Sequence, residues 1–587
     1  MKQLFTKWGK NLNKDQILSE YPRPQLVRDS YLNLNGEWDY AISKEEDYSG
    51  IDGKILVPFS PESVLSGVNR FVKPDDFLIY HKEVVLPEGF LKDKLILHFG
   101  AVDQEAKVYI NDELVKCHLG GFTPFKVDIE NYVENNHFSL KVVVNDITDT
   151  SFRQTGKQRI KRGGIFYTPQ SGIWQTVWLE SVPENYIKDI LITTDFDAFK
   201  AKIKIIKDTE EVISGKIKLI FKNKVILEQD FQNDEVEIKI LDMKSWTPES
   251  PNLYDFEISY GNDLVRGYFG MRKFERKPDK NGIMRFYLNN KPYFLSGVLD
   301  QGYYPDGLLT NPSDEAHIYD ILTMKDYGFN FLRKHIKIES LRWYYHCDRL
   351  GMIVWQDMIN GSTSKDVKVH HVLSMLNINL NDKYYAFFGR KDKPGRIQYM
   401  IELDEMLNYL KNITCISTWV PFNESWGQFH ALDVERHVRK FDSTRLIDHA
   451  SGWSDRKGGD YHSRHFYFKK FSFPIKKAKK RILALTEFGG YSLRLREHSF
   501  NPEDIFGYKI YNTEKELNNA VEALYVDQVY PQIKNGLNVL VYTQVSDVED
   551  EVNGFLTYDR EILKIDIDMM KKINKALSDK FTESFEK

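Results

Sequence analysis

Two glutamates stand at the ends of short apolar runs that are typical of buried β-strands. Glu424 follows TWVPFN, and Glu487 follows LALT and precedes Phe-Gly-Gly. Two carboxyl groups about 5–5.5 Å apart can cleave a glycosidic bond with retention, one as nucleophile and the other as acid/base. The nucleophile has to be ionised and the acid protonated near neutral pH, so the two need different surroundings.

The neighbouring residues offer such surroundings. Trp419, Phe422 and Trp426 can supply an apolar wall for Glu424, and Arg333 can supply a cation beside Glu487. The alternative is that each glutamate is merely solvated or hydrogen-bonded, which is the commoner fate of a single Glu after a strand. Two such residues in one domain favour the catalytic interpretation without excluding the other.

Residues 276–587 show the alternation of strands and helices that predicts a (β/α)8 TIM barrel. Helices are predicted in SDEAHIYDILTMKDYG, ESLRWYYHCDRLG and RIQYMIELDEMLNYLKN. Glu424 and Glu487 then follow the fourth and seventh strands, at the face where such barrels do chemistry, and the long connection 358–393 lies on that face too. The eight strands are predicted at 293–299, 329–335, 352–357, 416–422, 445–450, 463–468, 481–488 and 538–545.

The first half of the chain is predicted to be all-β. Residues 1–183 contain alternating apolar runs separated by turns, as in KILVPF and AKVYIND, which indicates a jelly-roll β-sandwich. Residues 184–275 continue with about seven short strands, which fits an immunoglobulin-like sandwich. The chain is therefore expected to be multidomain, with two β-sandwiches before the barrel.

Composition sets limits on partners and location. The 587 residues carry a formal charge of −4, so no electrostatic signal for nucleic acid or an anionic membrane is present. No apolar run reaches the length of a membrane helix, no N-terminal signal is recognised, and three cysteines suggest no disulfide framework, so a cytoplasmic location is expected. No metal or cofactor is predicted: the adjacent His370 and His371 are poorly placed to converge on one ion, and no phosphate-binding loop is found.

Several motifs together resemble glycoside hydrolase family 2, which includes β-galactosidases, β-glucuronidases and β-mannosidases. YLNLNGEWDY and SGIWQTVWLE resemble its sugar-binding jelly roll, and WTPESPNLYDFEI with GYFGMRKF resembles its immunoglobulin-like domain. GFNFLRKH, CDRLGMIVWQD, KNITCISTWVPFNESWGQ and LTEFGG resemble its barrel. The resemblance covers nearly the whole chain, and its most specific part is Trp419-x-x-x-Asn423-Glu424.

The resemblance implies a role for each matching position. Glu424 matches the acid/base and Glu487 the nucleophile, Asn423 the residue that bonds the sugar 2-hydroxyl, and Arg333 the arginine that steadies the nucleophile. A tyrosine near the sixth strand usually bonds the nucleophile as well, and Tyr467 is the candidate, with Tyr461 as the alternative.

The sequence departs from the family where the sugar would bind. Arg333-Lys334-His335-Ile336-Lys337 lacks the usual Tyr-Pro, and the eighth-strand segment VYTQVSDVEDEVNG lacks the usual tryptophan. These departures leave the identity of the sugar open. Candidates for the sugar subsite are Asp300, Gln301, His335, Asp357 and Gln544, with Trp426, Trp453 and Tyr304 as stacking candidates.

The activity implied is that of a retaining exo-β-glycosidase on a carbohydrate substrate, first of all a β-galactosidase. β-Glucuronidase and β-mannosidase are alternatives; a glucuronidase needs a cation for the sugar carboxylate, for which Lys334, Lys337 and Arg162 are candidates. The loop 156–172 is expected to reach the pocket rim or else to be a solvated basic loop. An alternative of another class is a non-catalytic carbohydrate-binding protein. A homo-oligomer is possible from the family resemblance.

Overall fold

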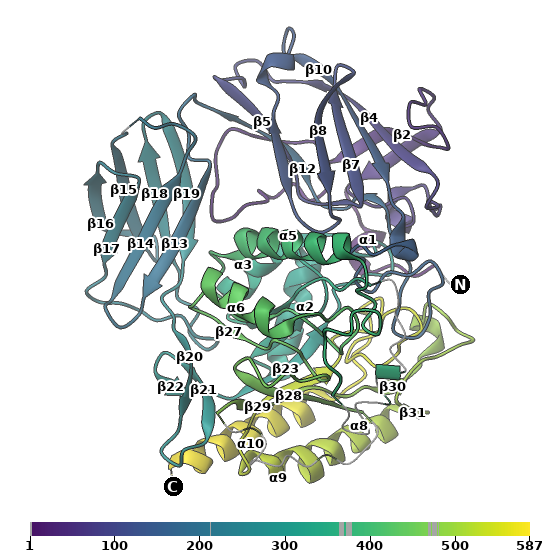
Figure 1. Ribbon diagram of the computed structural model, residues 1–587, viewed down its shortest axis with the longest axis vertical. Helices are drawn as coiled ribbons and strands as arrows, with labels where there is room; N and C mark the ends of the chain where they lie inside the picture. Colours follow the sequence, from purple (N-terminus) through teal and green to yellow (C-terminus); the bar gives the residue numbers. More distant parts are fainter. Residues whose placement is uncertain are drawn as a thin grey trace.

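The structure is a computed structural model that describes residues 3–211, 213–362, 369–370, 372, 379–467, 471, 478 and 480–586. It has the three-domain layout that the sequence predicts, with two β-sandwiches packed on a barrel (Figure 1). Part of the predicted connection 358–393, including His371, and Phe468 of the predicted sixth strand lie outside the described residues. In the described part of the chain no helix is long and apolar enough to cross a membrane.

The N-terminal domain, at the top of Figure 1, is a sandwich of two antiparallel sheets. Their facing sides bury Trp38, Leu97 and Val142 in one core. One sheet has the order β1 (Tyr31–Asn33), β12 (Val177–Val182), β5 (Lys94–Phe99) and β9 (Phe125–Asp128). The other has the order β3 (Gly53–Val57), β2 (Gly36–Ser43), β4 (Phe77–Val85), β10 (His137–Asn145), β7 (Glu105–Ile110) and β8 (Glu113–Leu119), and β6 (Val102–Asp103) pairs with β11 (Gly172–Ile173).

The second domain is a seven-stranded sandwich at the left of Figure 1. Its two sheets bury alternate residues such as Ile203, Ile217 and Phe256. One sheet has the order β13 (Asp189–Asp195), β14 (Lys200–Ile206) and β17 (Glu235–Lys239). The other has the order β16 (Lys224–Phe231), β15 (Gly215–Phe221), β18 (Tyr254–Tyr260) and β19 (Asp263–Phe269). A small sheet of β20 (Phe274–Pro278), β21 (Met284–Leu288) and β22 (Lys291–Pro292) follows, and β20 spans the predicted boundary between residues 275 and 276. The predicted domain limits themselves stay predictions.

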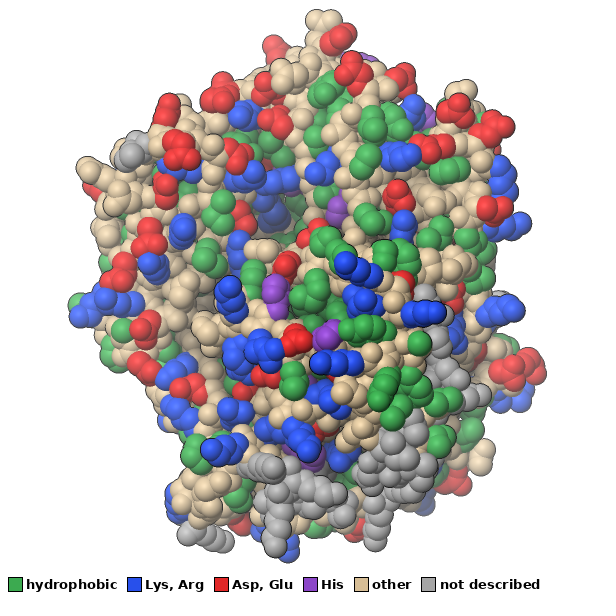
Figure 2. All heavy atoms as spheres, in the orientation of Figure 1, with side chains coloured by type: hydrophobic (Ala, Val, Ile, Leu, Met, Phe, Trp, Pro, Cys, Tyr) green, Lys and Arg blue, Asp and Glu red, His purple; other side chains and the backbone are tan. Residues whose placement is uncertain are grey.

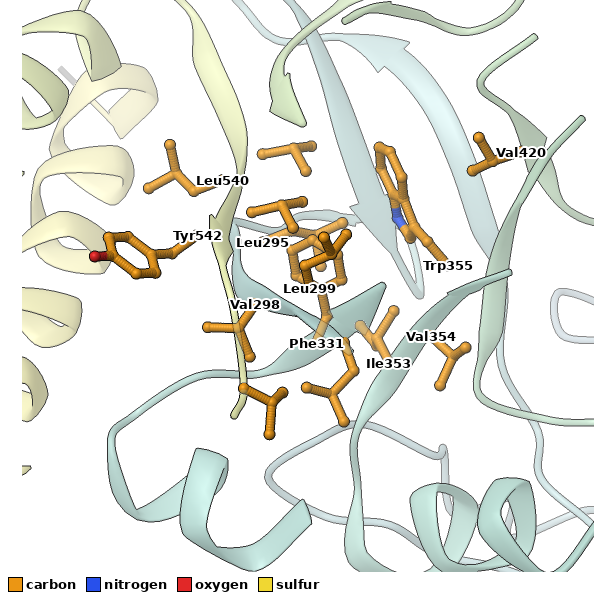
Figure 3. Packing of buried hydrophobic residues seen from close by; sticks show 14 of the residues in the cluster. Leu295, Val298, Leu299, Phe331, Ile353, Val354, Trp355, Val420, Leu540 and Tyr542 are labelled. Atoms are coloured by element: carbon orange, nitrogen blue, oxygen red, sulfur yellow. The ribbon is translucent and has the colours of Figure 1, made fainter. Parts of the chain in front are cut away.

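The C-terminal domain holds an eight-stranded parallel sheet curled into a barrel, with β27 and β28 at its two ends. The strands are β23 (Leu295–Asp300), β24 (Phe331–Lys334), β25 (Ile353–Asp357), β26 (Ile416–Val420), β27 (Leu446–Ile447), β28 (Tyr461–Phe466), β29 (Ile482–Gly489) and β32 (Leu537–Thr543). Each overlaps one of the eight predicted strands. Branched and aromatic side chains from several strands fill the core (Figure 3), so the barrel is a packed scaffold rather than a pore.

Helices surround this sheet. The N-cap carboxylate of Asp392 accepts from the Gly395 amide at the start of α5, and α3 ends at Gly351 in the left-handed conformation that favours glycine. The predicted helices correspond to α2 (Asp314–Asp326), α3 (Leu341–Leu350) and α5 (Lys393–Leu410). The others described around the barrel are α6 (Ala431–Phe441), α8 (Glu514–Ala523), α9 (Tyr530–Ile533) and α10 (Ile567–Glu586), and β30 (Tyr491–Leu493) pairs with β31 (Lys509–Tyr511) in the excursion after β29.

The N-terminal sandwich rests on the barrel through α5 (Figure 1). Thr123 donates to the Glu405 carboxylate at 2.7 Å, and Gln154 donates to Glu402 at 3.3 Å. Acidic and basic side chains lie side by side over most of the face in Figure 2, as expected from the nearly balanced charge. Residues of the N-terminal domain are thereby held close to the barrel mouth.

Candidate active site

Glu424 and Glu487 meet at the C-terminal mouth of the barrel. Glu424 lies four residues after β26, and Glu487 lies near the end of β29. Both are buried, with 5% and 4% of their surfaces exposed, and one carboxylate oxygen of each lies within 4.8 Å of the other. A separation of this size matches that of two carboxyl groups acting on the same sugar carbon in retention.

Glu487 is surrounded by hydrogen-bond donors. Arg333 Nη1 lies 3.2 Å from Oε1, and the Tyr467 hydroxyl donates to Oε2 at 2.5 Å. Burial raises the pKa of Glu487 and the charge of Glu424 raises it further, while His465, Arg333 and Tyr467 act in the opposite direction. The hydrogen bonds from Arg333 and Tyr467 favour the ionised form that a nucleophile requires. The alternative tyrosine, Tyr461, bonds instead to Thr418 at 3.0 Å.

Arg333 is held rigidly by its own partners. Its Nε and Nη2 donate to the two oxygens of Asp357 at 2.9 and 3.0 Å, and Nη2 also donates to Asn423 Oδ1 at 2.7 Å. Burial disfavours the cation, yet the charges of Asp357 and Glu487 hold the pKa of Arg333 above its usual range. A planar guanidinium fixed at both edges keeps one geometry toward Glu487. His335 joins this network through Nδ1, 2.7 Å from Asp357 Oδ2.

Two polar atoms beside Glu424 are buried without partners among the described residues. They are Asn423 Nδ2 and Trp426 Nε1. The Trp426 ring itself packs on Phe166, with ring centroids 6.1 Å apart. The turn that carries these residues has Glu424 and Ser425 in the left-handed region, with φ of 52° and 70°. Unsatisfied donors at a strained turn are typical of a site that a ligand completes.

The remaining predicted subsite residues have different hydrogen-bond partners and do not form one network. Asp300 accepts from Lys334 Nζ at 2.7 Å and so belongs to a different network from Arg333. Gln544 donates to Asn553 at 2.9 Å, and the Oε1 atoms of Gln544 and Gln301 are buried without described partners. Of the three stacking candidates, Trp453 lies 6.2 Å from His465 between ring centroids, and Tyr304 contacts Arg560 at 4.4 Å.

His465 is a site residue that the sequence analysis does not identify. It lies on β28 between the two glutamates, with Nδ1 2.9 Å from Glu424 Oε1 and 3.4 Å from Glu487 Oε2. Burial, with Arg333 and Lys157 nearby, lowers the pKa of His465 to about 4 despite the charge of Glu487. Its position two residues before Tyr467, on the same face of a strand, is the sequence signal that points to it.

The loop 156–172 of the N-terminal domain reaches the mouth, as one of the two expectations had it. The amide of Gly156 donates to Asn360 O at 2.8 Å, and Tyr167 donates to Glu551 Oε2 at 2.6 Å. Arg162 pairs with Glu549 at 3.0 Å. On the other side, Tyr508 stacks on Tyr467 with centroids 3.7 Å apart. Segments distant in sequence thus come together near the two glutamates.

Glu424, His465 and Glu487 each offer an atom of the kind that binds metals, and these atoms lie within 4.8 Å of one another. They are, however, hydrogen-bonded to each other, and the Arg333 guanidinium contacts the same cluster. An approaching cation would be repelled by Arg333, so the arrangement favours proton chemistry over metal binding.

Comparisons with known proteins agree with this geometry. Family models match residues 66–183 (glycosyl hydrolases family 2, sugar binding domain), 185–272 (glycosyl hydrolases family 2) and 281–478 (glycosyl hydrolases family 2, TIM barrel domain). A β-galactosidase of Thermoanaerobacter pseudethanolicus is 26% identical over 351 residues, covering 56% of this chain and 46% of that protein. A β-glucuronidase of Streptococcus agalactiae is 25% identical over 360 residues, covering 57% and 58%.

Among solved structures, a β-glucuronidase of an uncultured Clostridium species has the same fold, with a TM-score of 0.73 at 18% identity and coverage of 94% of this chain and 99% of that one. The chain spans about half the length of the curated relatives that it matches. The three family models together span more than half of the 587 residues, in the order jelly roll, immunoglobulin-like domain and barrel. The chain belongs to glycoside hydrolase family 2.

Proposed function

We propose that the protein is a retaining exo-β-glycosidase in which Glu487 is the nucleophile and Glu424 the acid/base. The observation that carries this proposal is the approach of the two carboxylates within 4.8 Å, with hydrogen bonds from Arg333 and Tyr467 to Glu487. This asymmetry supplies one ionised and one protonated carboxyl group, as the two-step mechanism requires.

In the first step, Glu487 attacks the anomeric carbon while Glu424 gives its proton to the departing oxygen. The glycosidic C–O bond breaks as the bond from C1 to the Glu487 oxygen forms. In the second step, Glu424 takes a proton from water, whose oxygen bonds to C1 and releases Glu487. Asn423 Nδ2, which has no partner among the described residues, is placed to bond a sugar hydroxyl beside the reacting carbon.

A 2-deoxy-2-fluoro β-glycoside with a good leaving group tests this assignment. The fluorine slows both steps, and the good leaving group speeds only the first, so the glycosyl enzyme should accumulate, and peptide mass spectrometry should find the sugar on Glu487. A label on another residue, or hydrolysis of an ordinary β-glycoside with inversion in an NMR time course, would contradict the mechanism.

The sequence points first to β-galactosides, and one observation favours a second candidate, β-linked uronic acids. Of the cations predicted for a sugar carboxylate, Lys334 pairs with Asp300 and Glu339, Lys337 pairs with Glu339, and Arg162 pairs with Glu549. Each therefore already has a counter-ion. This leaves a different cation, Lys157 from the loop of the N-terminal domain, to consider.

Lys157 is 6% exposed and forms no ion pair with the residues that the structure describes. It lies near the site, because its charge, together with burial, lowers the pKa of both His335 and His465. Its charge also opposes the rise that burial causes in the pKa of Glu551, and a carboxylate on the bound sugar would be a further anion for this buried ammonium. The β-glucuronidases among the similar proteins fit this candidate.

Rates on 4-nitrophenyl β-galactoside, β-glucuronide and β-galacturonide distinguish the candidates. If the protein hydrolyses β-linked uronic acids, Lys157→Met should lower kcat/KM for the uronide about 100-fold and change kcat/KM for the galactoside much less. Lys161→Met, an exposed lysine in the same loop, is the matched control. A wild-type preference for the galactoside with no effect of Lys157→Met would eliminate the uronide candidate.

A further inference from the structure

The imidazole of His465 connects the two glutamates to a chain of hydroxyl groups behind them. Nδ1 faces Glu424 Oε1 at 2.9 Å, and Nε2 lies 3.3 Å from Ser451 Oγ. Ser451 Oγ in turn donates to Thr486 Oγ1 at 3.1 Å, and Thr486 Oγ1 donates to the carbonyl of Arg464 at 3.4 Å.

The last acceptor, the carbonyl of Arg464, fixes which group donates in each hydrogen bond of this series. A carbonyl oxygen only accepts, so the single hydrogen of Thr486 is used there, and Thr486 has to accept the hydrogen of Ser451. The carboxylate of Asp448 is a second acceptor for the same Ser451 hydrogen, since Ser451 lowers the pKa of Asp448. Either way Ser451 has no hydrogen left for His465, so its oxygen accepts from Nε2–H.

The imidazole then has one tautomer. With its pKa lowered to about 4, His465 is neutral at pH 7, and a neutral ring with its proton on Nε2 carries a lone pair on Nδ1. Packing holds the ring in place, because a Cβ on Gly452, whose φ is +81°, would lie 2.5 Å from His465 Cγ. The lone pair therefore points at Glu424.

We infer that His465 is a positioning residue that keeps the catalytic proton on Glu424 by accepting a hydrogen bond from its carboxyl group. This inference rests on the proposed function. In the resting enzyme the Glu424 O–H donates to Nδ1. When that proton passes to the departing oxygen, the Glu424 anion faces a lone pair rather than a donor, which makes it a stronger base toward water in the second step.

Other charged groups face the same atoms, and the test has to separate their effects. His465 is approached by Glu487 of β29, Arg333 of β24, Asp357 of β25 and Lys157 of the N-terminal loop. The charge of Glu424 also raises the pKa of Tyr467 and Tyr508. His465 also opposes the rise that burial causes in the pKa of Glu487, so the acid limb, which Glu487 sets, is read separately from the alkaline limb, which Glu424 sets.

The experiment compares pH profiles of kcat/KM for a poor and an activated leaving group, phenyl and 2,4-dinitrophenyl. For His465→Ala, the alkaline limb should move down by about one pH unit, and at pH 7 the phenyl glycoside should lose about 10–100-fold while the dinitrophenyl glycoside changes only a few-fold. Ser451→Ala should move the limb in the same direction by less, because the preference for the Nε2–H tautomer is lost.

Tyr461→Phe is the matched control, since it removes a buried hydrogen bond on the same strand without touching the glutamates, and its profile should be that of the wild type. An unmoved limb in both variants, or a limb that moves up, would overturn the inference; an upward shift would mean that Nδ1 donates. If His465→Ala does not fold, Ser451→Ala decides. Labelling of Glu487 by the fluorinated sugar with an unmoved limb refutes only the role of His465, whereas absence of that label refutes the proposed mechanism.

Discussion

Arg333 and Lys334 are neighbours on β24, equally buried, and they lie in two different charge networks. Arg333 contacts Asp357 and Glu487, and a third carboxylate, Glu424, lies within 4.8 Å of Glu487. Lys334 contacts Asp300 and Glu339 and lies 4.0 Å from the Trp343 ring centroid of α3. Alternation along a strand sends the two side chains to opposite sides of the barrel wall.

The two networks differ in the balance between acidic and basic side chains. In the Lys334 network, Lys334 and Lys337 neutralise Asp300 and Glu339, and the lysines lower the pKa of Glu339 to about 2 although burial opposes this. In the Arg333 network, acids outnumber the cation, and burial with the charge of Glu424 raises the pKa of Glu487. A balanced buried network stabilises a fold, whereas an unbalanced one leaves protons to be exchanged with a substrate.

The largest expected effect is that of Glu487→Gln. We expect kcat/KM to fall by roughly 10⁴-fold or more, because the covalent step is lost, with the melting temperature unchanged or raised since a buried acid is removed. Rates on activated aryl β-glycosides and circular dichroism of the folded variant measure the two parts. Turnover equal to that of the wild type would remove Glu487 as the nucleophile.

Glu424→Ala tests the other carboxyl group. Glycosides with poor leaving groups should lose about 10³-fold in rate, because they need the proton, while 2,4-dinitrophenyl glycosides should lose far less in the first step. Azide should rescue the activated substrates by replacing water as the attacking group, giving a β-glycosyl azide that chromatography detects. Equal losses for all leaving groups, without rescue, would argue against the acid/base role.

Arg333→Lys and Lys334→Met test the comparison directly. Arg333→Lys should lower kcat/KM about 100-fold with little change in the free energy of unfolding, because a lysine cannot bridge Asp357 and Glu487. Lys334→Met should instead lower the free energy of unfolding by about 3–5 kcal/mol, since Asp300 and Glu339 lose a counter-ion, with kcat of the folded enzyme changed only a few-fold. The reverse pattern in denaturant titrations and kinetics would show that the two networks have been assigned the wrong way round.

The smallest effect concerns a buried acid in the N-terminal sandwich. Glu62 accepts from the amides of Val72 and Ser171 at 3.1 and 3.0 Å, and burial raises its pKa to about 8. The folded state thus holds a proton that the unfolded state releases above about pH 4.5, so the free energy of unfolding falls as the pH rises from about 4.5 to 8. Glu62→Gln should remove this loss, raising stability at pH 8 by about 2–4 kcal/mol, as measured by urea titration at pH 5 and 8. An identical pH dependence in the variant would contradict the assignment.

Most of the fold follows from local sequence patterns. The barrel strands are short apolar runs bounded by turns, so all eight are predicted within a few residues of where they lie. β16 lies at the edge of its sheet, and because most of its residues are exposed its sequence shows no clear apolar alternation. The segment 448–460 between β27 and β28 is described and contains no helix, although the alternating pattern favours one there.

Strand ends and family motifs are enough to predict the positions of Glu424, Glu487, Asn423 and Arg333. Strand register decides the rest. Asp300 pairs in register with Lys334, and Leu299 with Arg333, so Asp300 lies on the side of Lys334. The approach of Lys157 depends on how one domain packs on another, which no local pattern encodes.

Because of the loop from the N-terminal sandwich, the surroundings of the two glutamates are built from two domains. Glu424 and Glu487 belong to the barrel, while the loop 156–172, which contacts the barrel through Gly156 and Tyr167, comes from a domain more than 200 residues earlier in the chain. Exchange of that sandwich between related enzymes would alter which ligands are accepted without disturbing the bond-breaking apparatus. Under the proposed function, the barrel would keep the bond-breaking step and the sandwich would help to decide which sugar is accepted.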